Sequence, residues 1–163
     1  MLPCALTEPA SAVADRLKAR GGTIAIAESS AGGLVAAALV AVPGASAYFR
    51  GGLVIYTLDG AQELLAGGSP LGTGVRSASE PFACWLASSV AARLSADWGF
   101  GETGAAGPAG NPYGDPAGHA WLAVRRPDGS LATRHILTGS DDRAANMDAF
   151  AAAGLALLLE ALG

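Results

Sequence analysis

The sequence Thr23-Ile24-Ala25-Ile26-Ala27-Glu28-Ser29-Ser30-Ala31-Gly32-Gly33 indicates the fold class more directly than any other part of the chain. Residues 23–27 are apolar and partly β-branched, which is typical of a short buried strand. Small residues follow, and residues 34–41 then form a helical run. Upstream, apolar residues recur at three- and four-residue steps over residues 8–20, which predicts an amphipathic helix capped by Thr7. The order helix, strand, turn, helix indicates an α/β fold.

The remainder of the chain continues this alternation of strands and helices. The expected elements, in chain order, are a strand at residues 48–57, a short helix at 59–66, a glycine-rich loop at 67–75, a helix opened by the capping-box spacing of Ser77-Ala78-Ser79-Glu80, a long loop at 104–118, a hairpin of strands 119–126 and 131–137, and a final helix opened by Ser140-Asp141-Asp142. We therefore expect a single domain over residues 1–163, with three layers of helix, sheet and helix around a central mixed sheet.

The composition excludes several classes of protein. Of the 163 residues, 51% are hydrophobic and 15% are charged, which argues against a disordered chain. The apolar run at residues 33–42 is about half of the roughly 20 residues that a membrane helix needs. The net charge of −4 disfavours nucleic acid and anionic membranes as partners. Without a basic leader or a cysteine framework, we expect a cytoplasmic protein, and homo-oligomerisation stays open.

Lysine is nearly absent from the sequence. The ten basic residues are nine arginines and the single lysine Lys18. Any mechanism that needs a lysine side chain therefore has one candidate. On the helical spacing of residues 8–20, Lys18 lies away from the apolar stripe, where a solvated lysine is expected.

The turn at residues 28–33 carries the strongest chemical signal. It places two serines between a buried strand and a helix start, where backbone N–H groups lack intrahelical acceptors and the helix dipole favours an anion. Gly32 and Gly33 would let a ligand approach the backbone closely. The same residues also fit a capped helix that packs tightly on the sheet, and the turn alone does not separate the two interpretations.

Three further patterns each have a functional and a structural interpretation. A Gly-x-Gly-x-x-Gly match at residues 99–104 is rejected as a dinucleotide fingerprint, because we expect it between a helix and a loop instead of between a strand and a helix. His119 and His135, with Asp115, suggest a metal site, but their spacing favours ordinary polar strand residues. The loop at residues 104–116 is long and glycine-rich, and we expect it to face a ligand. We expect neither a metal nor a cofactor.

Together these stretches resemble the CinA C-terminal domain family, whose characterised members are nicotinamide-nucleotide amidohydrolases. The resemblance spans about residues 6–161 in one colinear register. The matched motifs are Ala-Glu-Ser-Cys-Thr-Gly-Gly at residues 27–33, Phe-x-Arg-Gly-Phe-Val-Thr-Tyr-Ser-Asn at 49–58, Val-Ser-Glu-Pro at 78–81, Thr-Gly-Ile-Ala-Gly-Pro at 103–108, Lys-Pro-Val-Gly-Thr-Val-Trp at 115–121 and Gly-Asp-Arg at roughly 139–143.

The resemblance implies a chemistry and a set of contacts. Family members hydrolyse the carboxamide of nicotinamide mononucleotide to nicotinic acid mononucleotide and ammonia, with a serine matching Ser29 as nucleophile, a lysine as its base and no metal. A serine hydroxyl is a weak nucleophile unless a neighbouring base removes its proton. The substrate, a small-molecule nucleotide, would contact Ser30, Gly32, Gly33, Tyr56, Gly104, Ala106 and Gly107.

The sequence departs from the family pattern at charged positions. The family's catalytic lysine falls on Ala61, whose methyl group cannot accept a proton. The lysine of the Lys-Pro-Val-Gly segment falls on Asp115, and an arginine of the last helix falls near Asn146. The usual pair of serine and lysine therefore cannot form at these positions.

Three hypotheses for the function stay open. The chain is an amidohydrolase that keeps Ser29 and uses another base, for which Glu28, Tyr56 and His119 are the candidates. Alternatively, it is a catalytically silent module that binds a pyridine nucleotide. The third hypothesis is an interaction domain without a ligand.

Overall fold

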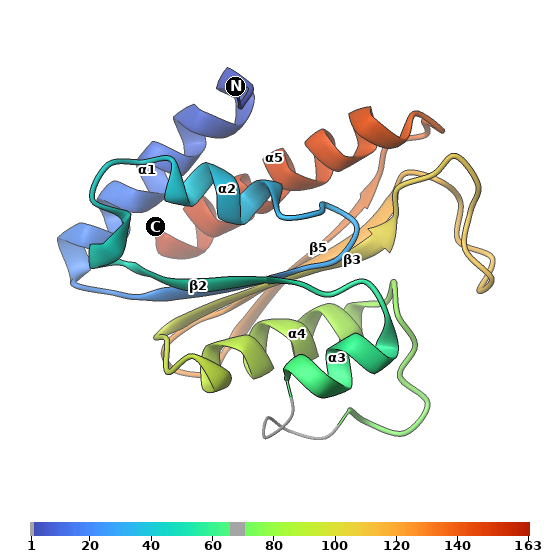
Figure 1. Cartoon of the computed structure of the whole chain (residues 1–163), viewed down its shortest axis with the longest axis horizontal. Helices are drawn as coiled ribbons and strands as arrows, with labels where there is room; N and C mark the ends of the chain where they lie inside the picture. Colours follow the sequence, from blue (N-terminus) through green and yellow to red (C-terminus); the bar gives the residue numbers. More distant parts are fainter. Residues whose placement is uncertain (1, 66–70) are drawn as a thin grey trace.

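The computed structural model of the chain describes residues 2–65 and 71–163 (Figure 1). Residues 67–70 of the expected glycine-rich loop lie outside the described residues. The elements, in chain order, are α1 (Cys4–Arg20), β1 (Ile24–Glu28), α2 (Leu34–Val40), the 3-10 helix η1 (Ala45–Ala47), β2 (Phe49–Val54), α3 (Leu58–Leu64), α4 (Glu80–Arg93), β3 (Trp98–Ala105), β4 (His119–Arg125), β5 (Leu131–Leu137) and α5 (Arg143–Leu162).

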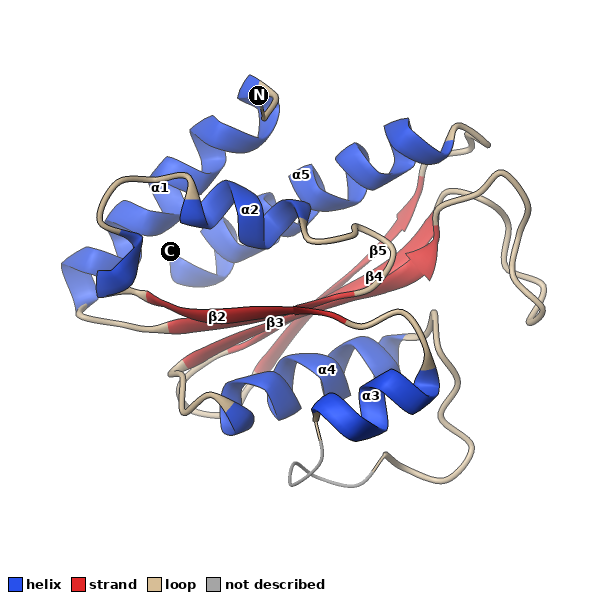
Figure 2. Cartoon of the chain, viewed as in Figure 1, coloured by secondary structure: helices blue, strands red, loops and turns tan. Residues whose placement is uncertain are grey.

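The helices and the sheet form three layers, which confirms the predicted α/β class with a central mixed sheet. Helices α1, α2 and α5 cover one face of the sheet, and α3 and α4 cover the other (Figure 2). The strand order is β2-β1-β3-β4-β5. Strand β1 runs parallel to β2 and β3, whereas β4 and β5 continue the sheet in antiparallel pairs. The carboxyl ends of β1, β2 and β3 therefore lie along one edge of the sheet.

Helices α1 and α5 hold the larger apolar core against the sheet. Leu17 of α1, Leu155 and Leu158 of α5, and Phe100 of β3 are fully buried in one cluster. Each such side chain contributes about 1.5–3 kcal/mol when it leaves water. Helix α5 is long and apolar enough to cross a membrane by length and composition alone, but in this fold its buried side packs on α1 and the sheet.

Helix α1 begins earlier than predicted. It starts at Cys4 with Pro3 before it, so Thr7 lies inside the helix and does not cap it. Leu6 is fully buried in the core. Because tertiary packing supplies most helical stability in proteins, the burial of Leu6 accounts for the additional turn.

Helix α4 also begins differently from the capping-box prediction. The side chain that caps it belongs to Ser79, whose hydroxyl accepts a hydrogen bond from the Phe82 amide at 3.4 Å. Ser77 lies outside the helix, because Ala78 adopts a left-handed conformation with φ of 53° and interrupts the helical path.

Strand β3 is the element that sequence reasoning missed. Its glycines weaken the strand signal, and the Gly-x-Gly-x-x-Gly match lies wholly inside it, not between a helix and a loop. A Cβ on Gly99 or Gly101 would overlap the backbone carbonyl oxygen of Ala87 or Ala83 in α4. The glycines therefore let α4 lie directly on β3. Because this close packing accounts for the glycines, they do not indicate a dinucleotide fingerprint.

Candidate functional site

The candidate site lies where β1 and β2 end. From the end of β1 the chain turns to α2 on one face of the sheet, and from the end of β2 it turns to α3 on the opposite face (Figure 1). Connections that diverge in this way open a crevice outside the carboxyl ends of parallel strands, where ligands of α/β proteins bind. The predicted residues Ser29 and Tyr56 each follow one of these two strands, and the structure brings them together.

A small cavity occupies this crevice. Its volume is about 40 Å³. One water molecule needs about 10–15 Å³ of space of this kind, so the cavity fits a few water-sized atoms, which is the size of one functional group of a ligand. The remainder of a ligand would lie at its mouth, where Tyr56 is 63% exposed. The lining residues are Ser29, Ile55, Tyr56, Thr57, Leu58, Ser77 and Phe82.

Glu102 shapes the serine turn from the neighbouring strand β3. The backbone amides of Ser29 and Ala31 donate to Glu102 Oε2 at 3.0 and 2.8 Å, and the Ser30 hydroxyl donates to Glu102 Oε1. Glu102 has no solvent exposure. The amides and the hydroxyl are therefore bound to the protein's own carboxylate.

Glu28 fills the start of α2 in the same way. Its carboxylate accepts hydrogen bonds from the amides of Gly33, Val35 and Ala36 at 3.1, 3.1 and 2.8 Å. These are the N–H groups that the sequence suggested for an anion or an oxyanion. Because Glu28 already occupies them, the capped-helix interpretation of the turn describes the structure, and a ligand anion must bind elsewhere.

Burial makes both carboxyl groups weak acids. It raises the pKa of Glu28 to about 7, against the lowering effect of the three amides that donate to it, and the nearby Glu102 adds to the rise. Burial likewise raises the pKa of Glu102, although Ser30 and the turn amides oppose the change. Glu28 therefore favours its protonated form at mildly acidic pH, and burial disfavours the charged form of Glu102 in the same direction.

Replacing Glu28 with glutamine should change how stability depends on pH. The carboxyl group ionises near 4.5 when unfolded and near 7 when folded, so between these values only the folded chain holds the proton. Its stabilising contribution is complete below about pH 4.5 and is lost as pH rises to about 7. At about 1.4 kcal/mol per pH unit, this effect lowers the unfolding free energy of the wild type by about 3 kcal/mol between pH 5 and pH 8. The Glu28→Gln variant should lack this decrease.

Urea unfolding of both proteins at pH 5, 6, 7 and 8 measures this difference. Parallel pH profiles for the two proteins would show that the folded Glu28 carboxyl does not ionise near 7.

Position 61 faces an apolar cluster beside the cavity. Ala61 in α3 is fully buried among side chains that include Ile55 and Phe82, two residues of the cavity wall. Among the described residues, no side chain forms a hydrogen bond with the Ser29 hydroxyl. Lys18 lies in the last turn of α1, near the opposite end of β1, where its amine donates to the Pro43 carbonyl at 3.1 Å. The expectation that Lys18 does not replace the family base is consistent with this placement.

The three alternative bases each have other partners. Glu28 is held by the α2 amides, and the Tyr56 hydroxyl accepts from Arg143 at 2.5 Å. The His119 Nε2 atom lies 2.8 Å from the Ala78 carbonyl oxygen, and its Nδ1 atom lies 2.9 Å from Nε2 of His135. In the described part of the chain, none of the three forms a hydrogen bond with the Ser29 hydroxyl.

Most of the residues predicted to touch the substrate lie away from the wall of the cavity. Ser30 is buried against Glu102, and a Cβ on Gly32 or Gly33 would contact side chains of α5 or β2. Gly104 pairs with Ala120 inside the sheet and does not line the cavity. The structure therefore places only Ser29 and Tyr56 of the predicted residues on the cavity wall.

The loop after β3 is tied to the start of α5. The Ala106 carbonyl accepts from Asn146 at 2.8 Å, and the Gly107 carbonyl accepts from Arg143 at 2.7 Å. Arg143 therefore links this loop to Tyr56 at the mouth of the cavity. Sequence reasoning placed Arg143 in the Gly-Asp-Arg motif match without a role at the site. It missed Glu102, although a lone acid in the apolar segment 98–105 was a usable signal.

The histidine pair is confirmed as a neighbouring pair on the hairpin. His119 lies 3.7 Å from Asp115, and Asp115 forms a bidentate ion pair with Arg76 at 2.5 and 3.1 Å. The Arg76 guanidinium lowers the pKa of Asp115. The residues that the structure describes contain no group of three or more histidine, cysteine or acidic side chains that could hold a metal ion.

Sequence comparisons give one consistent family. The model of the CinA C-terminal domain matches residues 6–162. A CinA-like protein of Anaeromyxobacter sp. (strain K) is 39% identical over 143 residues, which cover 88% of this chain and 35% of that protein. A CinA-like protein of Prochlorococcus marinus (strain MIT 9313) is 41% identical over 124 residues, covering 76% and 29%. The chain thus spans about a third of the length of these relatives.

Solved structures agree with the sequence relatives. The competence/damage inducible protein CihA of Agrobacterium tumefaciens superposes with a TM-score of 0.89 at 29% identity, covering 99% of this chain and 98% of that one. A competence-damaged protein (CinA) superfamily protein of Enterobacter cloacae gives a TM-score of 0.89 at 28% identity, with coverage of 97% and 92%. Almost the whole fold is therefore shared with these proteins.

Proposed function

Because this chain belongs to the CinA C-terminal domain family, we propose that it binds nicotinamide mononucleotide at the crevice beside Ser29 and does not hydrolyse it. The ligand is the substrate class that the family resemblance implies. In this proposal the carboxamide end enters the small cavity, and the ribose and phosphate lie at its mouth. The protein would act as a binding module for a pyridine mononucleotide.

The observation that carries the proposal is the environment of position 61. Hydrolysis requires a group that takes the proton from the Ser29 hydroxyl as the oxygen attacks the carboxamide carbon. Ala61 presents a methyl group to an apolar cluster beside the cavity, and the described surroundings of Ser29 offer no amine. Without a base, an attacking serine loses a contribution of typically 10²–10⁴ in rate.

The shape of the cavity supports retained binding. Tyr56 provides an exposed aromatic ring at the mouth, and hydroxyl groups of Ser29, Thr57 and Ser77 provide polar contacts on the wall. A few polar groups on an otherwise apolar wall are typical of ligand sites. Loss of the base with retention of this wall is the pattern expected of a binding module.

A diverged amidohydrolase is the second candidate function. The observation in its favour is that Ser29 keeps its place on the cavity wall without a hydrogen-bond partner for its hydroxyl among the described residues. A hydroxyl in this position can attack the carboxamide of a bound ligand if a basic group of that ligand takes the proton. The two candidates differ in whether ammonia is released.

Calorimetric titration with nicotinamide mononucleotide tests the binding part of the proposal. The wild-type chain should release heat and saturate at one ligand per chain. A Ser29→Leu variant, whose larger side chain enters the cavity, should bind at least about tenfold more weakly, as expected for an overpacked site. The matched control is Glu63→Ala on the exposed side of α3, which should bind as wild type does. Absence of heat with the wild-type chain would contradict the proposal and favour an interaction domain.

A further inference from the structure

We propose that His119 is a positioning residue that holds Ser77 on the wall of the cavity, where the Ser77 hydroxyl binds the carboxamide of the ligand. The inference rests on the proposed function, because the ligand that Ser77 binds is the one proposed above. Ser77 lines the cavity together with Ser29. His119 lies behind this wall at the start of β4 and acts on Ser77 through the backbone of Ala78.

The backbone of Ala78 decides where Ser77 lies. Ala78 has a φ of 53°, a left-handed conformation that residues other than glycine rarely adopt. It separates Ser77 from Ser79, the cap of α4, so the turn at residues 76–79 directs Ser77 away from the helix and onto the cavity wall. Strained backbone of this kind persists only where the surrounding structure holds it, and it clusters at functional sites. We call residues 76–79 the Ala78 turn.

Two buried side chains of the sheet hold Ala78 by its own peptide groups. Thr103 Oγ1 of β3 accepts from the Ala78 amide at 3.0 Å, and His119 Nε2 donates to the Ala78 carbonyl oxygen at 2.8 Å. Thr103 is 1% exposed and His119 is 6% exposed. Because the two bonds lie on either side of one Cα atom, together they fix both backbone angles of Ala78. Loss of either bond would let Ala78 return to an ordinary conformation and move Ser77 from the wall.

The imidazole of His119 is oriented for this contact. A carbonyl oxygen can only accept, so Nε2 of His119 carries a proton. Nδ1 on the other side of the ring lies 2.9 Å from Nε2 of His135, and the His135 ring in turn stacks on Trp121. In the neutral His119 ring, Nδ1 then accepts from His135. The second contact fixes the plane of the His119 ring and therefore the direction of its bond to Ala78.

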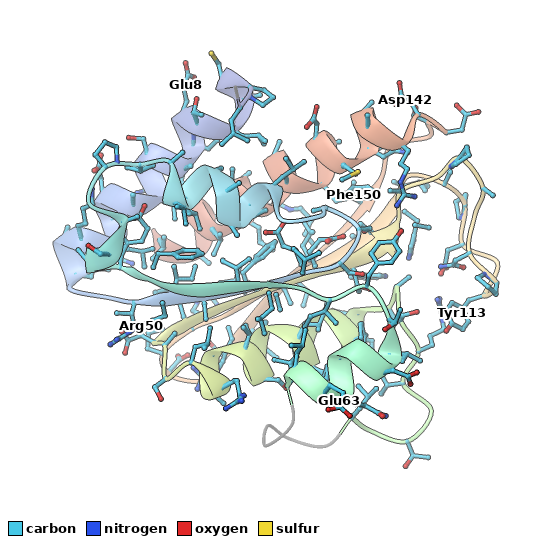
Figure 3. The ribbon with its side chains drawn as sticks, in the orientation of Figure 1. Glu8, Arg50, Glu63, Tyr113, Asp142 and Phe150 are labelled. Carbon is cyan, nitrogen blue, oxygen red and sulfur yellow. The ribbon has the colours of Figure 1, made fainter. Side chains whose placement is uncertain are left out.

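The other hydrogen bonds and ring contacts of the Ala78 turn are local or pass through a long side chain. The Ser79 hydroxyl donates to the Arg76 carbonyl at 2.7 Å within the turn itself. The Arg76 guanidinium lies 4.9 Å from the centre of the Tyr113 ring on the loop after β3 (Figure 3). The Ser77 hydroxyl donates to the Tyr113 hydroxyl at 3.4 Å, a long bond that a ligand group can replace. His119 and Thr103 are therefore the two groups that tie the backbone of the turn to the sheet.

A double-mutant cycle tests whether His119 acts through Ser77. Nicotinamide mononucleotide is titrated by calorimetry into wild type, Ser77→Ala, His119→Leu and the double variant. Each single variant should bind about fivefold more weakly, as expected for one lost hydrogen bond, and the double variant should bind no more weakly than either. His119→Gln, whose amide can still donate to the Ala78 carbonyl, should bind within about twofold of wild type. The matched control is His135→Leu, which changes an exposed ring, leaves the bond to Ala78 in place and should also stay within about twofold.

Hydrogen exchange of the Ala78 amide tests the positioning without a ligand. His119→Leu should speed exchange of this amide at least about tenfold relative to the Leu17 amide in the core, and His119→Gln should leave the ratio near its wild-type value. The relative rate separates a local opening of the turn from a general loss of stability. If His119→Leu does not fold, His119→Asn replaces it under the same criteria, because its shorter amide ends before the Ala78 carbonyl.

The outcomes separate the two proposals. If the losses in affinity add in the double variant, or if His119→Leu changes neither the affinity nor the relative exchange rate of Ala78, His119 does not position Ser77. If wild type binds no nicotinamide mononucleotide while the exchange rates change as expected, the positioning holds and the proposed ligand is wrong. If there is neither binding nor a change in exchange, both proposals are wrong.

Discussion

Replacing Ala61 with lysine should convert the chain into a nicotinamide mononucleotide deamidase, with ammonia release at least about tenfold above wild type. The lysine would start from a fully buried position in the apolar cluster that includes Ile55 and Phe82. Burial disfavours the charged ammonium, so the side chain would hold a neutral amine near neutral pH. A neutral amine beside the Ser29 hydroxyl can remove its proton.

The increase in the rate of ammonia release should remain below the full effect of a general base. The amides of Ser29 and Ala31 already donate to Glu102, so they are not available to stabilise the negative charge that develops on the carboxamide oxygen. Part of the catalytic machinery would therefore come from cavity hydroxyls such as Ser77. We expect a change in the rate at saturating nucleotide, with little change in affinity.

Two variants control the Ala61→Lys experiment. Ala61→Met introduces a long side chain without a base and should stay inactive. The double variant Ser29→Ala, Ala61→Lys should lose the gained activity, because the new base would have no serine to activate. Circular dichroism and thermal unfolding establish that each variant is folded. Folded Ala61→Lys that binds nucleotide but releases no more ammonia than wild type would show that more than the base is missing.

Replacing Glu102 with alanine should destabilise the fold by about 4 kcal/mol. The change removes the acceptor for the Ser29 and Ala31 amides and for the Ser30 hydroxyl, all inside the protein. Each buried donor left without an acceptor costs about 1–3 kcal/mol, and the deleted side chain leaves a cavity. Urea unfolding at pH 7 measures the loss.

Glutamine at the same position supplies the matched comparison. Its amide oxygen can accept from both backbone amides, and its NH₂ group can donate to the Ser30 hydroxyl oxygen. Glu102→Gln should therefore stay within about 1 kcal/mol of wild type. Glu63→Ala, on exposed α3, should also be close to wild type (Figure 3). A small loss for Glu102→Ala would mean that the serine turn does not depend on this carboxylate.

Local patterns predicted most of the fold because those elements carry their own signals. The strand at residues 24–28 is uniformly buried, and the hairpin turn at Pro127-Asp128-Gly129 has the positive φ that its glycine favours. Strand β3 carries no such signal. Its strand conformation depends on pairing with β1 and β4 and on α4 lying against its glycines, and these contacts are not visible in a local pattern.

At the site, too, residues within a local motif could be predicted from the sequence, whereas residues distant in the sequence could not. Ser29 and Tyr56 were predicted because each lies in a recognisable motif at the end of a strand. Glu102 is 73 residues from Ser29 in the sequence, and Arg143 is 87 residues from Tyr56. The sheet order brings each pair together, so their roles followed only from the three-dimensional arrangement.

The most direct test of the central claim is the fate of the bound nucleotide. Wild-type chain saturated with nicotinamide mononucleotide is incubated, and the nucleotide is then recovered and separated from nicotinic acid mononucleotide while ammonia is measured in parallel. The Ser29→Ala variant sets the background. We expect the nucleotide to be recovered intact, with ammonia at the Ser29→Ala level. Stoichiometric or greater conversion to nicotinic acid mononucleotide by wild type, absent in Ser29→Ala, would contradict binding without turnover and identify a working amidohydrolase.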